Sequence, residues 1–164
     1  MALVVENGTG LSTAESYISV ADADTRATAL GNTAWTGSDT EKESALRRAT
    51  EYLEQRYRSR WKGTRLLRDQ ALSWPRYGAE VDGYDIDSTV VPREVANACA
   101  DLAAKALTAT LSADVERTAI REKVGPIEVE YSPYSPTSTR YVAVCDALAP
   151  FLTGSASCAR LVRA

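Results

Sequence analysis

Apolar residues recur at intervals of three and four over much of the chain, which is the spacing of one face of an α-helix. The clearest example is about residues 39–61. Ser38 and Glu41 form a capping-box pattern at its start, and Gly63 follows its end. The stretch therefore predicts one long amphipathic helix, whose apolar positions are Ala45, Leu46, Ala49, Tyr52, Leu53 and Tyr57.

Three shorter stretches predict further helices. The first opens with Ser19 as N-cap and runs to about Leu30, where a Gly-Asn pair ends it. The second begins at Pro92, a residue suited to a first helical position, and continues to about Leu111. The last covers about residues 140–152, and a proline near its end is expected to shorten it.

Over residues 127–131 the apolar residues recur at every second position, since Ile127, Val129 and Tyr131 alternate with two glutamates. This alternation predicts a strand with one apolar face, paired with residues 118–124 into a β-arm. Because an isolated hairpin is marginally stable in water, its apolar face needs a partner. We expect that partner to be a neighbouring subunit; packing on the chain's own helices is the alternative.

These elements together predict a mainly α fold, a bundle of about four helices with one β-arm. A chain of 164 residues suits a single domain. We place the helical domain in residues 1–153 with the arm at about 118–131, and a flexible docking tail in residues 154–164. Residues 64–91 are expected to be mostly irregular.

The formal net charge of −3 conceals a block of basic residues. Residues 47–76 hold nine Lys and Arg residues against three acids, and acidic stretches flank them. One interpretation is charge pairing within or between subunits. The other is a nucleic-acid surface, which the interleaved aromatic residues Tyr57, Trp61, Trp74 and Tyr77 favour and the acidic total disfavours.

No combination of residues predicts catalysis. Histidine is absent, and the three cysteines, Cys99, Cys145 and Cys158, form no CxxC motif. The acids of residues 82–87 do not follow the order of a calcium loop, and Gly8-Thr9-Gly10 is too short for a phosphate loop. We therefore expect no catalytic residue, no cofactor, no metal and no membrane span, in a protein made inside the cell.

Several motifs in a fixed order resemble a family of tailed bacteriophages that is often labelled "DnaT-like single-stranded-DNA-binding protein" and whose members resemble head–tail connectors. The resemblance covers nearly the whole chain, and its motifs are Val5–Gly10 with Ser16–Val20, Gly31–Trp35, Ala45–Leu53, Gln70–Arg76, Arg121–Tyr131 and Arg160–Ala164.

The resemblance implies a structural virion protein of the phage neck, made in the host cytoplasm. About twelve copies would form a homo-oligomeric ring between the portal and a stopper or tail-completion protein, with double-stranded DNA passing through the centre without sequence specificity. The label implies the alternative, a single-stranded-DNA-binding protein.

Two sets of interface residues complete these expectations. The tail residues Arg160, Leu161, Val162 and Arg163 are expected to dock on the portal. The subunit interface is expected to contain Ile127, Val129 and Tyr131 of the arm and Arg56, Arg58 and Arg60 of the basic block.

Overall fold

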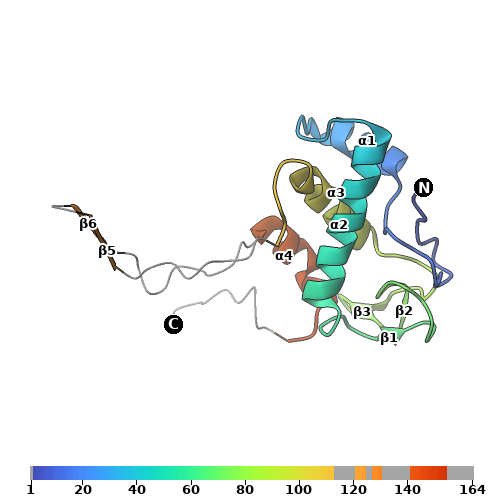
Figure 1. Cartoon of the computed structure of the whole chain (residues 1–164). Coiled ribbons are helices and arrows are strands. Elements are labelled where there is room, and N and C mark those ends of the chain that lie inside the picture. Colours follow the sequence, from blue (N-terminus) through green and yellow to red (C-terminus); the bar gives the residue numbers. More distant parts are fainter. Residues whose placement is uncertain (1, 113–120, 125–126, 131–140, 155–164) are drawn as a thin grey trace.

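The computed structural model describes residues 2–112, 121–124, 127–130 and 141–154 (Figure 1). The helices are α1 (Val20–Leu30), α2 (Asp39–Tyr57), α3 (Arg93–Ala106) and α4 (Val142–Leu148), followed by the 3₁₀ turn η1 (Ala149–Phe151). The strands are β1 (Thr64–Arg65), β2 (Arg76–Tyr77), β3 (Glu80–Val81), β4 (Tyr84–Asp85), β5 (Arg121–Val124) and β6 (Ile127–Glu130). They pair antiparallel as β1–β2, β3–β4 and β5–β6.

The prediction of a mainly α bundle is wrong, because the fold is mixed α and β. The four helices are accompanied by the pairs β1–β2 and β3–β4, which lie in the segment 64–91 that the sequence predicted as mostly irregular. Each of these strands has only two residues. A strand of that length is too short to produce a visible alternation of apolar and polar positions, so the sequence pattern could not reveal it.

The predicted starts of α1 and α2 are confirmed by their caps, whereas Pro92 is the N-cap of α3 rather than its first helical residue. The Ser19 side chain accepts a hydrogen bond from the Asp22 N–H, and Ser38 and Glu41 form both bonds of the capping box. The C-terminal ends of the helices differ more from their predicted positions. Helix α2 ends at Tyr57 rather than near residue 61, and α3 ends at Ala106 rather than near residue 111. After α4 the chain tightens into η1 at Pro150, which cannot continue an α-helix.

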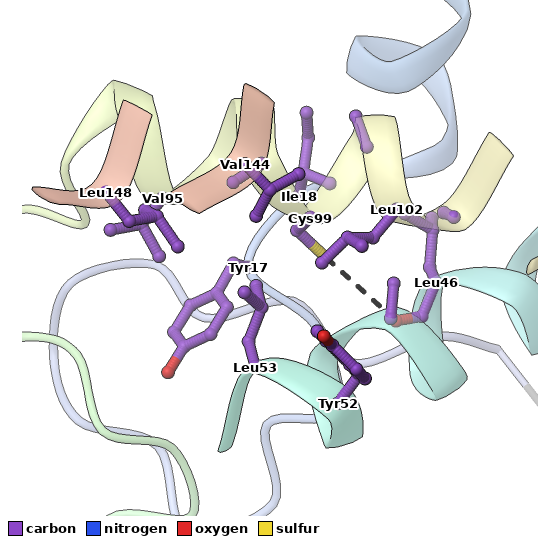
Figure 2. Close-up of a cluster of buried hydrophobic side chains, with 14 of the residues drawn as sticks. Tyr17, Ile18, Leu46, Tyr52, Leu53, Val95, Cys99, Leu102, Val144 and Leu148 are labelled. Atoms are coloured by element: carbon purple, nitrogen blue, oxygen red, sulfur yellow. Dashed lines mark hydrogen bonds between the residues drawn. The ribbon is translucent and has the colours of Figure 1, made fainter. Parts of the chain in front are cut away.

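The core lies between α2 and α3, and α4 and the segment before α1 close it (Figure 2). Leu46 and Leu53 of α2 are fully buried against Leu102 of α3 and Leu148 of α4. Cys99 is fully buried in the same cluster, 3.2 Å from the Thr50 hydroxyl, and burial raises the pKa of its thiol. This cysteine therefore serves as a small core residue rather than as a nucleophile.

The N-terminal segment is fastened by a buried carboxylate. Glu6 is 5 % exposed, and its two oxygens accept 2.9 Å hydrogen bonds from the N–H groups of Gly8, Gly10 and Leu11. The loop that contains the first motif of the family resemblance is thus closed around Glu6. Glu6 therefore stabilises the conformation of this loop.

The segment that contains β1 and β2 is held by the guanidinium of Arg76, which is 7 % exposed. Arg76 donates to the carbonyl oxygens of Lys62 (2.7 Å), Gly63 (2.6 Å), Ser73 (3.2 Å) and Trp61 (3.5 Å). Burial lowers the pKa of this guanidinium. One side chain therefore joins two separate stretches of backbone, residues 61–63 and the turn at Ser73.

A half-buried carboxylate joins the same segment to α2. Glu54 accepts hydrogen bonds from the Tyr17 hydroxyl and from the N–H (3.0 Å) and hydroxyl (2.7 Å) of Ser73. Burial and then the Glu54 carboxylate raise the pKa of the Tyr17 hydroxyl. The network accounts for the Ser-Trp-Pro motif structurally, since it brings Trp74 into the core beside Trp61.

Candidate interaction surfaces

No catalytic arrangement is visible in the described residues. Among them, no group of three or more His, Cys, Asp or Glu side chains is placed to hold a metal ion. None of the described helices is long and apolar enough to cross a membrane. The buried side chains of Glu6 and Arg76 and the half-buried side chain of Glu54 bind backbone and neighbouring side chains.

The basic block begins with Arg47 and Arg48 inside α2 and continues past the C-terminal end of this helix, where cations complement the helix dipole. Arg56, Arg58 and Arg68 are exposed, and no ion pair joins them to another residue in the part of the chain that the structure describes. Their guanidinium groups are available to an external partner. Two of them, Arg56 and Arg58, were predicted as subunit-interface residues.

Two other basic residues after α2 contribute to the fold. The Arg60 guanidinium donates to the Gly154 carbonyl at 3.1 Å, and the Lys62 ammonium donates to the Glu80 carbonyl at 3.0 Å. The backbone from Arg60 to Lys62 also bonds to residues 151–153, so it anchors the end of η1. The structure therefore divides the basic block into an exposed set and a structural set.

The aromatic residues interleaved with the basic block are divided in the same way. Tyr57, Trp61 and Trp74 are buried and form tilted and edge-on ring contacts in the core. Tyr77 is 68 % exposed, and it lies on β2 opposite Thr64 of β1. Only Tyr77 among these four could stack on a base. Periodicity and composition gave no sign of this difference.

Tyr84 is a further exposed aromatic residue, 78 % accessible, that the sequence analysis did not single out. It lies on β4 in a hairpin that also carries Glu80, Asp82 and Asp85. The acidic surroundings oppose phosphate binding and suit a basic protein surface.

The β-arm is present as the pair β5–β6, close to its predicted position. The register sets Arg121 opposite Glu130 and Lys123 opposite Glu128. It also sets Glu122 opposite Val129 and Val124 opposite Ile127. Within the described residues the two strands contact each other and no other helix or strand.

The remaining predicted site residues lie outside the described part of the chain. They are Tyr131 of the arm and the four tail residues Arg160, Leu161, Val162 and Arg163.

A hollow of about 540 Å³ lies between the ends of α1, α3 and α4. Its lining includes Asn32, Asp101, Lys105, Tyr141 and Val142. Asp101 is paired with Arg26 at 2.8 Å, and the Lys105 ammonium lies 5.7 Å from the centre of the Tyr141 ring. No sequence pattern indicates this site, because its lining residues come from three separate parts of the chain.

The described residues thus form a small mixed α/β domain whose candidate sites are binding surfaces. Residues 1–164 match the family described as "Putative DnaT-like ssDNA binding protein", and the chain belongs to this family. No curated protein and no solved structure matches the chain.

Proposed function

We propose that the protein is a structural subunit that assembles with copies of itself and joins a phage head to a tail. The observation that supports this most is the β5–β6 hairpin, which contacts no other element in the described part of the chain. A two-stranded hairpin alone is marginal in water, so the alternation of Ile127 and Val129 with glutamates in the sequence favours a binding partner. A second copy of the chain supplies one at every position of a closed ring.

The remaining parts of this proposal rest on the family resemblance. The ring would contain about twelve copies, as in connectors, and would surround double-stranded DNA at the neck of the virion. Tail residues 160–163 would bind the portal, and a stopper or tail-completion protein would bind the opposite side. Since DNA must slide through, the exposed Arg56, Arg58 and Arg68 would meet acidic protein surfaces more than phosphates.

Replacing Ile127 and Val129 by aspartate should weaken self-association more than about a hundredfold, because each apolar side chain contributes roughly 1.5–3 kcal/mol when buried. Light scattering after gel filtration measures the change, and circular dichroism should show an unchanged helix content. Val90→Asp is the matched control, since Val90 is 47 % exposed on the body of the protein. Oligomers that persist in the double variant would contradict the assignment of the arm.

Single-stranded DNA binding is the second candidate function, and the family description favours it over the connector. The specific observation behind it is that residues 56–77 carry one exposed tyrosine, Tyr77 on β2, and three exposed arginines without an ion pair in the described part of the chain, Arg56, Arg58 and Arg68. Base stacking on a tyrosine and phosphate binding by arginines are the usual components of such a site.

The test is fluorescence anisotropy with a labelled oligothymidylate over a series of salt concentrations. Replacing Arg56, Arg58 and Arg68 by glutamine should reduce the slope of log affinity against log salt by about 2, since each single-strand phosphate contact contributes about 0.7. Arg93→Gln is the control, because Arg93 is exposed at the start of α3 in an acidic stretch. An unchanged slope, or no binding by the intact protein, would reject this function.

A further inference from the structure

The β3–β4 hairpin turns tightly at Asp82 and Gly83. Both residues have a positive φ, +54° and +83°, and two such residues in succession form the turn that suits a two-residue hairpin loop. The register sets Glu80 directly opposite Asp85 across the two strands. The turn and the register therefore fix where this hairpin presents its charged side chains.

The two carboxylates of this strand pair repel each other. Glu80 and Asp85 are both exposed, and like charges directly opposite each other destabilise a pair of strands. The Lys62 ammonium binds the backbone carbonyl of Glu80 at 3.0 Å. No ion pair joins either carboxylate to a cation in the part of the chain that the structure describes. A cationic partner from outside this part of the chain would remove the repulsion.

The same hairpin exposes an aromatic ring. Tyr84 is 78 % accessible, the largest fraction among the exposed large apolar side chains of the described residues. Guanidinium groups pair with carboxylates and also stack on the faces of aromatic rings. The hairpin therefore carries both kinds of group that recognise arginine.

Exposed arginines are present at the C-terminal end of α2. Arg56 and Arg58 are the two neighbours of the buried Tyr57, and neither has an ion pair within the described residues. The charge of the two regions is opposite over a longer range as well. Residues 47–76 hold nine basic residues against three acids, and residues 77–101 hold six acids against one arginine. Each copy of the chain thus carries both halves of a complementary contact.

We propose that the β3–β4 hairpin of one copy of the chain binds Arg56 and Arg58 of a second copy. This inference rests on the proposed assembly and names one of its contacts. Glu80 and Asp85 pair with the guanidinium groups, and the Tyr84 ring lies against one of them. The pairing removes the repulsion between the two carboxylates and gives both arginines a partner. It can repeat from copy to copy, because every chain carries one hairpin and one pair of arginines.

The experiment exchanges the charges of the two surfaces in the full chain. One variant carries Glu80→Lys with Asp85→Lys, and the other carries Arg56→Glu with Arg58→Glu. Each variant alone should self-associate at least about tenfold more weakly than the unaltered chain, because like charges then meet. An equimolar mixture should recover the association, since every hairpin then finds a surface of opposite charge. Light scattering after gel filtration at low salt measures both results.

Matched controls make the same changes of net charge elsewhere on the molecule. They are Asp39→Lys with Glu94→Lys, and Arg48→Glu with Arg93→Glu, all at exposed positions of α2 and α3. Self-association of these controls should change by less than about threefold, because exposed charges away from the contact are screened by salt. Equal weakening in the controls would show an effect of net charge alone and would contradict the proposed contact. Circular dichroism should show the same helix content in all variants.

The remaining outcomes separate this contact from the proposed assembly. Oligomers that persist in both charge-reversed variants would reject the contact and leave the assembly standing. A chain that is monomeric before any substitution would reject both. Recovery in a chain that carries all four substitutions, but not in the mixture, would show pairing within one chain and overturn the proposal. Loss of oligothymidylate binding in the Arg56→Glu, Arg58→Glu variant with unchanged self-association would assign these arginines to DNA instead.

Discussion

Arg76→Met is expected to reduce the free energy of unfolding by about 3–5 kcal/mol. Methionine has a similar length but no hydrogen-bond donor, so four carbonyl oxygens would lose the guanidinium that now binds them. Unpaired buried carbonyls each carry a desolvation penalty of about 1–3 kcal/mol, partly relieved where water enters. The β1–β2 pair and the connection to η1 should loosen together, because Arg76 binds the backbone of residues 61–63.

Chemical denaturation followed by tryptophan fluorescence measures this effect, since Trp61 and Trp74 lie beside Arg76 in the buried cluster. Arg68→Met is the matched control and should change stability by less than about 0.5 kcal/mol, because Arg68 is exposed. Arg76→Lys should be intermediate, since an ammonium keeps the charge but lacks the planar fork of donors. Equal stabilities of the Arg76→Met and Arg68→Met variants would contradict the structural role.

Gly8→Ala is expected to destabilise the protein by about 2–5 kcal/mol, from backbone strain and steric overlap together. Gly8 has a φ of +97°, a conformation that residues with a Cβ rarely adopt. A Cβ at this position would lie 1.7 Å from the Thr89 carbonyl oxygen, so the backbone of one segment must move. The loop closed by Glu6 would then separate from the segment before α3.

The Gly83→Ala variant separates the effect of backbone strain from the effect of steric overlap. Gly83 has a φ of +83°, and a Cβ there meets nothing within 4 Å. It should therefore show the strain alone, about 1–2 kcal/mol. Thermal unfolding by circular dichroism compares the two variants, and equal losses would mean that the Gly8 loop does not lie against Thr89 as described.

Local chemistry made the helices predictable from the sequence alone. The caps at Ser19 and Ser38 and the apolar repeat of α2 involve residues within four positions of each other. All the interacting residues are therefore close together in the sequence and can be recognised there. The alternation over residues 127–130 predicted the β6 strand for the same reason, and its partner β5 begins only a few residues earlier. The order of motifs likewise indicated the family that the chain matches over its whole length.

Only the tertiary structure decided the roles of the basic and aromatic residues between α2 and α3. Arg76 is buried because it finds carbonyl oxygens 13 to 15 positions away, and Trp74 is buried because Glu54 and Tyr17 hold its loop from other segments. Tyr77, one residue after Arg76, is exposed because side chains alternate along a strand of only two residues. Composition and periodicity describe neighbours along the chain, whereas burial here depends on contacts between distant segments. The division of the basic block and the hollow between α1, α3 and α4 therefore appeared only in the folded chain.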